Sequence, residues 1–150
     1  MKKIEMVDLK GQYRHIKEQV NKSVLETIES AMFINGPKVK SFQDHLEKYL
    51  DVKHVIPCAN GTDALQIALM GVGLKPGDEV ITADFTFAAT VEVISLLGLT
   101  PVLVDVDPKT FNIDLPSIEK VIGPKTKAII PVHLFGQAAD MEEILALANK

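Results

Sequence analysis

Residues 58–65 hold the side chains and amides best suited to bind an anion. They read Cys-Ala-Asn-Gly-Thr-Asp-Ala-Leu, and Thr62 and Asp63 stand where a helix is expected to begin, directly after Gly61. The unpaired N–H groups at a helix N-terminus attract phosphate. A phosphate here would accept hydrogen bonds from the Thr62 and Asp63 amides and from the Thr62 hydroxyl. Spacing alone favours a plain N-cap before a buried helix, because a single glycine is a weak phosphate signal.

Phe87 is a second candidate, for contact with a planar ligand. An aromatic side chain at the end of the neighbouring strand could lie flat on a ring whose phosphate is held at Thr62. Such stacking contributes about 0.5–1.5 kcal/mol beyond burial. Phe85 lies two residues earlier, and the two side chains cannot both be ligands. The spacing by itself favours core or capping roles for both.

Four other residues carry weaker signals. His133 follows an expected buried strand, where it could lie over a ligand or hydrogen-bond to the backbone. Cys58 stands in an apolar run without a histidine partner, which favours a small core residue over a nucleophile. Asp105 and Asp107 precede a proline, which is typical of a turn at a strand exit, and no metal-ligand spacing is present.

Composition narrows the classes of function. Of the 150 residues, 47% are hydrophobic and 24% charged, and the net charge is -4. Arg14 is the sole arginine, which argues against a nucleic-acid partner. The single cysteine excludes an internal disulfide framework and a cysteine-rich zinc site. No apolar run reaches the roughly 18 residues of a membrane span, and residues 1–5 lack the apolar stretch of a signal peptide. We therefore expect a soluble, cytoplasmic protein.

The elements that would position these residues alternate between strand and helix after residue 53. Apolar runs predict buried strands over residues 54–58, 79–82, 101–106 and 127–133. Helical patterns fall between and after them, at residues 62–70, 87–97 and 115–122 and from about residue 140. This order predicts an α/β fold with a mostly parallel sheet and helices on both faces. Ligands in such sheets bind beyond the carboxyl ends of the strands, where the candidates lie.

The first third of the chain follows a different pattern. Apolar residues at helical spacing predict amphipathic helices over residues 12–34 and 39–50, separated by a break at Asn-Gly-Pro, residues 35–37. We therefore expect a helical segment over residues 1–53 and an α/β domain over residues 54–150. Because a helix is still in progress at Lys150, we expect the domain to be incomplete and to continue in a longer protein.

Motifs along nearly the whole chain occur together in a characteristic order. They include Asp-Leu-Lys-Gly-Gln-Tyr (8–13), Phe-Ile-Asn-Gly-Pro (33–37), Asn-Gly-Thr-Asp-Ala-Leu (60–65), Pro-Gly-Asp-Glu-Val-Ile-Thr (76–82), Phe-Thr-Phe-Ala-Ala-Thr (85–90), Phe-Asn-Ile-Asp (111–114) and Pro-Val-His-Leu-Phe-Gly-Gln (131–137). Together with residues 101–108, they resemble the DegT family of nucleotide-sugar aminotransferases.

The resemblance implies a fold, a cofactor and roles for four residues. It implies the first part of the large domain of a fold-type-I enzyme dependent on pyridoxal 5'-phosphate (PLP), acting as a homodimer. Such enzymes transfer an amino group, usually from glutamate, to a keto sugar attached to a nucleotide. Gly61, Thr62 and Asp63 would form the phosphate cup, and Phe87 rather than Phe85 would stack on the cofactor ring.

The front of the chain is most similar to enzymes acting on a UDP-linked 3-keto N-acetylglucosaminuronic acid, for cell-surface polysaccharide synthesis. In these enzymes the positions of Ala31 and Phe33 approach the sugar nucleotide. Ala31 replaces a glycine and Phe33 a tyrosine, and loss of the tyrosine hydroxyl could alter the substrate. His133 stands where a serine is common, and it receives no role.

The resemblance also assigns chemistry to residues outside this chain. The lysine that forms the Schiff base with PLP, and the carboxylate facing the pyridine nitrogen, are expected beyond Lys150. No lysine of this chain is expected to take the place of the Schiff-base lysine, since Lys38, Lys40, Lys125 and Lys127 are expected at the surface. We therefore expect the 150-residue chain to be inactive alone. The alternatives are a PLP-dependent sugar dehydratase, with histidine in place of that lysine, and a non-catalytic, dimer-forming module.

Overall fold

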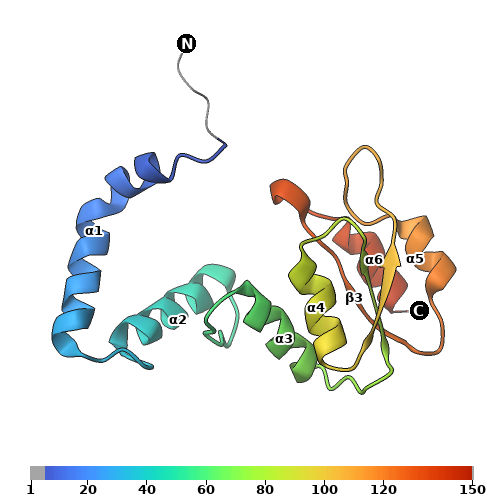
Figure 1. Ribbon diagram of the computed structural model, residues 1–150, viewed down its shortest axis with the longest axis horizontal. Helices are drawn as coiled ribbons and strands as arrows, with labels where there is room; N and C mark the ends of the chain where they lie inside the picture. The colour runs from blue at the N-terminus through green and yellow to red at the C-terminus, as the bar shows by residue number, and fades with distance from the viewer. Residues whose placement is uncertain (1–5, 150) are drawn as a thin grey trace, which may run out of the picture. The chain divides into compact units, whose positions relative to one another are not determined.

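The computed structural model describes residues 6–149, drawn in colour in Figure 1. The chain divides into two compact units, Met1–Pro57 and Cys58–Lys150. Within the described residues, no helix combines the length and the apolar character needed to cross a membrane.

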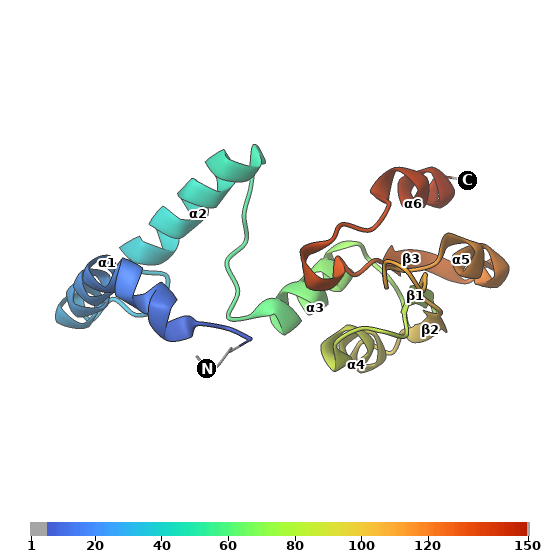
Figure 2. The same cartoon turned by 90° about the horizontal axis from the view of Figure 1, so that it is seen from above.

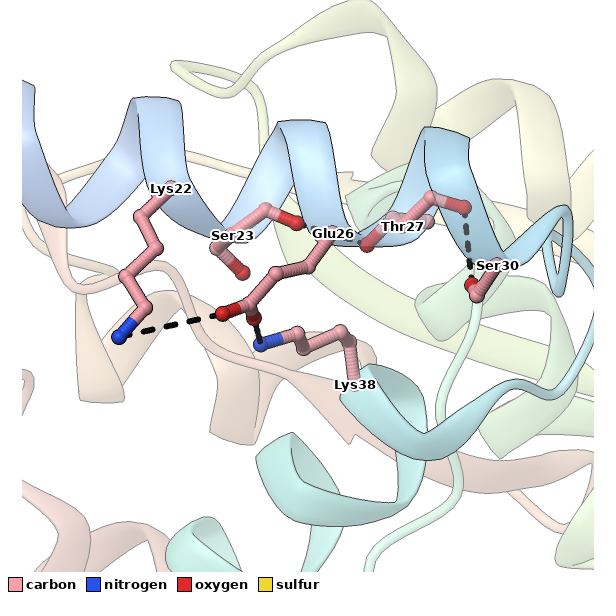
Figure 3. A network of polar contacts seen from close by, with 6 residues as sticks. All are labelled: Lys22, Ser23, Glu26, Thr27, Ser30 and Lys38. Carbon is pink, nitrogen blue, oxygen red and sulfur yellow. Dashed lines mark hydrogen bonds and ion pairs between the residues drawn. The ribbon is translucent and has the colours of Figure 1, made fainter.

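The first unit contains helices α1 (Leu9–Ser30) and α2 (Pro37–Leu50). The Asp8 side chain caps α1 by accepting a 2.8 Å hydrogen bond from the Gly11 amide. An ion pair links the two helices: Lys38 donates to Glu26 at 2.6 Å (Figure 3). This hydrogen bond holds the pKa of Glu26 below its ordinary value. Both side chains are solvent-exposed, so the pair adds little stability.

The turn between α1 and α2 begins earlier than the sequence predicts. The helix expected to reach residue 34 ends at Ser30, because Ala31 adopts the left-handed conformation with φ 52°. The Ser30 hydroxyl then accepts a hydrogen bond from the Met32 amide. A side chain at Gly36 would overlap with the Met32 carbonyl oxygen. The turn therefore requires glycine there for its close backbone approach.

The second unit is an α/β layer around a three-stranded sheet. Strands β1 (Glu79–Ala83), β2 (Thr100–Val104) and β3 (Thr126–Ile130) pair in the order β2-β1-β3, and both pairings are parallel. The helical elements are α3 (Gly61–Gly71), α4 (Ala88–Leu96), α5 (Leu115–Val121), the short 3-10 helix η1 (Leu134–Gly136) and α6 (Met141–Ala148).

Each face of the sheet carries its own hydrophobic cluster. Ile81 and Ala83 of β1 pack on one face with Ile118 of α5 and Ile144 of α6. On the other face, Val80 packs in a separate cluster whose helical members are Leu69, Val93 and Ile94, from α3 and α4. Figure 2 shows α5 and α6 on one side of the strands and α4 on the opposite side. The prediction of a parallel sheet with helices on both faces is confirmed.

The strand predicted over residues 54–58 is wrong. A strand exists only where its backbone groups find a partner strand, and no described strand pairs with this segment. The Val55 amide donates instead to the Glu47 side chain at 3.1 Å. Ile56 keeps 73% of its surface exposed, so the apolar character of the run does not reflect burial.

Candidate functional site

The start of α3 presents backbone donors that are not bonded to any acceptor in the described part of the chain. The Asn60 side chain caps the helix: its Oδ1 accepts from the Asp63 amide at 2.9 Å, and its Nδ2 donates to the Asp63 carboxylate at 3.1 Å. Within the described residues, the Gly61 and Thr62 amides and the Thr62 hydroxyl have no hydrogen-bond acceptor. The N-cap is therefore confirmed and leaves two amides available to an anion, but the expectation of a buried helix is wrong, since Leu69 is the only buried residue of α3.

The start of α3 is accessible to solvent. Gly61 and Thr62 are both exposed, and a Cβ built on Gly61 would meet no atom within 4 Å. Thr62 and Gln66 also line a groove of about 620 Å³ with Val91 and Glu92 of α4. The start of α3 therefore lies beside α4, although Phe87 does not line this groove.

The two phenylalanines that precede α4 have different surroundings. Phe85 packs against Phe111, with ring centroids 5.8 Å apart and an interplanar angle of 55°. Phe87 occupies the N-cap position of α4 and keeps 79% of its surface exposed. Phe85 keeps 47% of its surface exposed but packs on another ring, whereas the Phe87 ring is available to a ligand. The hydroxyls of Thr86 and Thr90 lie 2.9 Å apart and join the segment to the first turn of α4.

Ala31 and Phe33 belong to the first unit and line a groove of about 610 Å³ in the turn between α1 and α2. Ala31 is the left-handed C-cap of α1. Phe33 keeps 64% of its surface exposed. Both are therefore accessible from solvent, and Lys40 lines the same groove.

His133 and Cys58 contact backbone atoms. The His133 Nδ1 accepts a 3.1 Å hydrogen bond from the Ala139 amide, which supports a structural role for the ring. Cys58 was expected in the core but is exposed, and its thiol donates to the Asn60 carbonyl at 3.4 Å. The prediction for Cys58 is wrong because it depended on the absent strand.

Asp105 and Asp107 organise the turn after β2. Asp105 accepts from the Val106 amide at 2.8 Å, and Asp107 accepts from the amides of Lys109 and Thr110, both at 2.9 Å. The Thr110 amide, followed by that of Lys109, lowers the pKa of Asp107. The turn interpretation of these residues is confirmed. In the part of the chain that the structure describes, no group of three or more potential metal-ligating residues occurs.

Asn112 is a buried residue of this region that the sequence did not single out. It keeps only 7% of its surface exposed. Its Nδ2 donates to the Ala138 carbonyl at 3.0 Å, and its Oδ1 accepts from the Leu134 amide at 3.2 Å. Asn112 thereby ties the turn after β2 to the segment after β3. The only sequence signal is a polar residue between two apolar ones, Phe111 and Ile113, and that pattern has many causes.

The segments that follow the three strands meet at one edge of the sheet. Because all three strands are parallel, their carboxyl ends lie together, and these are the ends followed by Phe87, Asp107 and His133. Ligands of open α/β sheets bind at this edge. The arrangement offers amide donors for an anion at the start of α3 and an exposed aromatic ring at the start of α4.

Comparisons with known proteins agree with this architecture. Over 147 residues, the chain is 48% identical to a UDP-2-acetamido-2-deoxy-3-oxo-D-glucuronate aminotransferase from Pseudomonas aeruginosa, covering 98% of this chain and 41% of the relative. It matches the crystal structure of a DegT DnrJ EryC1 StrS aminotransferase from Brucella abortus with a TM-score of 0.92 and 44% identity, covering 98% of this chain and 41% of that one.

A third comparison concerns a structure that holds a cofactor. NtdA from Bacillus subtilis, solved with bound cofactor PMP, matches with a TM-score of 0.85 and 41% identity, covering 88% of this chain and 30% of that one. The chain thus spans about two fifths or less of the length of these proteins. Residues 14–150 match the sequence profile of one family. The chain belongs to the DegT/DnrJ/EryC1/StrS aminotransferase family, with the fold-type-I architecture of its PLP-dependent members.

Proposed function

We propose that this chain supplies the phosphate cup and the ring-stacking residue of a PLP-dependent sugar aminotransferase. The enzyme would transfer an amino group to the keto group of a nucleotide-linked sugar. The observation that carries the proposal is the pair of Gly61 and Thr62 amides, which have no hydrogen-bond acceptor among residues 6–149 and belong to exposed residues. The family membership gives the anion at this position its identity.

The residues present fit PLP. A phosphate at the start of α3 would accept hydrogen bonds from the Gly61 and Thr62 amides and from the Thr62 hydroxyl, where the helix dipole also favours negative charge. The exposed Phe87 ring offers one face to a planar pyridine. When bound, PLP supplies an electron sink for the carbon that carries the amino group.

Asp63 would contribute to the phosphate cup in a different way from Gly61 and Thr62, which would donate their amides to the phosphate. Its amide is already taken by the Asn60 side chain, and its carboxylate accepts from the Asn60 Nδ2. Asp63 would therefore serve the phosphate cup by keeping the first turn of α3 in place.

For the substrate we propose a UDP-linked 3-keto sugar, with glutamate as the amino donor. The support is the 48% identity to a relative named for a UDP-linked 3-oxo sugar. Ala31 and Phe33 would contact the sugar nucleotide, since both line the same solvent-accessible groove. Phenylalanine at position 33 offers an apolar contact without a hydroxyl. The product would serve cell-surface polysaccharide synthesis.

The remaining machinery is proposed to lie outside these 150 residues. We place the catalytic lysine and the carboxylate facing the pyridine nitrogen in a part of the protein beyond Lys150, and we propose that this chain alone does not transfer amino groups. We further propose that the whole protein acts as a cytoplasmic homodimer.

Variants of the complete enzyme test the phosphate cup. Thr62→Ala removes one hydrogen bond to a charged group, worth about 1.5–3 kcal/mol, so PLP should bind about tenfold more weakly or worse. Phe87→Ala should weaken binding by about two- to tenfold through lost stacking, and turnover should fall with it. The measurements are PLP titration and amino transfer from glutamate to the UDP-linked keto sugar.

Gln66→Ala is the matched control, because Gln66 lies one turn further along α3, beyond the two amides proposed to bind the phosphate. It should leave PLP affinity unchanged. Parental PLP affinity in both Thr62→Ala and Phe87→Ala would refute the proposed cup and stacking contact.

A further inference from the structure

The Phe111–Asn112 pair links two segments at the carboxyl edge of the sheet, yet neither residue has a part in the proposed chemistry. The Phe111 ring packs on Phe85, in the segment that joins β1 to α4. The Asn112 side chain holds the backbone of Leu134 and Ala138, in the segment that joins β3 to α6. One short turn thus contacts the exits of both β1 and β3.

Phe111 adopts an unfavourable backbone conformation to make its contact. Its φ of 59° lies in the left-handed region, which is uncommon for a residue with a large side chain. Such conformations persist where surrounding interactions enforce them, and they cluster at functional sites. Here the Phe111 amide donates to the Asp107 carbonyl at 2.8 Å, and the Asp107 amide donates to the Asn112 carbonyl at 2.9 Å.

Asn112 gives this turn a fixed base. Its side chain is buried, and its amide group both donates to and accepts from the backbone of the segment after β3. The turn is therefore bonded at its start by Asp107 and at its end by Asn112. The backbone of Phe111, between them, is therefore held in place, and its half-exposed ring packs on Phe85.

The contact reaches the ligand-facing aromatic residue through a short stretch of chain. Phe85 lies two residues before Phe87, and the hydroxyl of the intervening Thr86 contacts that of Thr90 in α4. The Asp84 amide donates to the Val104 carbonyl at 2.9 Å. Phe87 is thus held through its neighbours, while its own side chain packs on little and keeps 79% of its surface exposed.

We propose that Phe111 is a positioning residue for Phe87: by packing on Phe85, it fixes the backbone from which the Phe87 ring meets the cofactor. The inference rests on the proposed stacking role of Phe87. A pre-ordered ring loses less conformational freedom when a ligand binds, so the proposal concerns affinity and orientation. Without the Phe111 ring, the segment between β1 and α4 would adopt more conformations in the free protein and would lose more conformational entropy when the cofactor binds.

A double-mutant cycle in the complete holoenzyme tests this. Phe111→Leu should weaken PLP binding about threefold in the parental background and leave it unchanged in a Phe87→Leu background, because the effect passes through the Phe87 ring. The visible circular dichroism of bound PLP should fall in Phe111→Leu, since that signal reports ring orientation. Phe111→Tyr, which keeps the ring, should restore both values.

Two further variants separate positioning from general stability. Ile118→Val shortens a buried side chain of α5 that lies outside this turn, so it should lower the melting temperature without changing PLP affinity or dichroism. Asn112→Ala removes the hydrogen bonds that hold the turn to the segment after β3. Like Phe111→Leu, it should weaken PLP binding when Phe87 is present and have no effect in the Phe87→Leu background. If Phe111→Leu does not fold, Asn112→Ala carries the test.

Equal weakening in both backgrounds, or parental affinity and dichroism in Phe111→Leu, would overturn the positioning role. Failure of the unaltered enzyme to bind PLP is a separate result. It would overturn the proposed function, and the positioning role with it.

Discussion

The Asp107 carboxylate holds the turn after β2 through two backbone amides. Those of Thr110 and Lys109 donate to it, and they lower its pKa below the ordinary value of 3.8. A carboxyl group whose pKa is lower in the folded state than in the unfolded state binds fewer protons when folded. It therefore stabilises the fold at pH values above its unfolded pKa, and the contribution disappears as pH falls through the folded value.

We predict that Asp107→Asn reduces the acid sensitivity of this turn. The free energy of unfolding should differ between parent and variant at neutral pH, and the difference should shrink as pH falls below about 4. Asparagine keeps an acceptor oxygen but has no titrating charge, and all other carboxylates are common to both proteins. Urea unfolding at a series of pH values measures the difference. A gap that stays constant down to the lowest pH would contradict the prediction.

Individual residues of the candidate site differ in how far the sequence predicts them. Gly61, Thr62 and Phe87 stand out because their types suit an anion and a planar ring, and the structure leaves them accessible. The capture of the Asp63 amide by Asn60 could not be chosen over a phosphate contact from spacing alone. Asn112 and the Phe85–Phe111 contact depend on segments brought together by the sheet, so no local pattern reveals them.

Among the elements, α3 depends most directly on its cap. The Asn60 side chain accepts from the Asp63 amide at 2.9 Å, while its own amide group donates to the Asp63 carboxylate. A hydrogen bond from an amide of the first helical turn to an N-cap side chain typically adds about 1 kcal/mol to the free energy of unfolding. The cap also sets the direction in which the Gly61 and Thr62 amides point.

We predict that Asn60→Ala lowers the free energy of unfolding by about 1 kcal/mol. Asn60→Asp keeps an acceptor at the cap, although it faces the Asp63 carboxylate and should recover only part of the loss. Chemical denaturation of the three proteins measures this order. Asn60→Ala with parental stability would show that the cap contributes nothing to the fold.

Helices were better predicted than strands, for a physical reason. A helix satisfies its hydrogen bonds locally, so the apolar spacing of α2, α5 and α6 is enough to locate them. A strand depends on its neighbours, and the apolar run at residues 54–58 finds none. The end of α1 was misplaced because Ala31 adopts a left-handed conformation that alanine rarely takes.

Across the whole chain, burial is concentrated in the second unit. Of the described residues in Met1–Pro57, only Gly36 is buried, and α1 and α2 contain no buried residue. In Cys58–Lys150, seven side chains from β1, α4 and α5 are completely inaccessible or nearly so: Val80, Ile81, Thr82, Ala83, Val93, Ile94 and Ile118. Local stability follows buried apolar contact, so the two units should open with different free energies.

Hydrogen exchange of the isolated 150-residue chain should report this difference. We predict that the amides of Val80–Ala83 in β1 exchange slowest and that those of α1 exchange at least about a hundredfold faster, which corresponds to a gap of some 3 kcal/mol in opening free energy. Mass spectrometry of exchanged peptides resolves the two regions. Comparable protection of α1 and β1 would contradict the prediction.

Strand β1 has one further consequence, because it is the central strand and is shared by both cores. Val80 belongs to one cluster, and Ile81 and Ala83 belong to the other. If the cluster on one face unfolded and β1 left the sheet, the cluster on the other face would lose the side chains that β1 contributes to it. On heating, both clusters should therefore unfold together in a single calorimetric transition, without an intermediate that retains one of them.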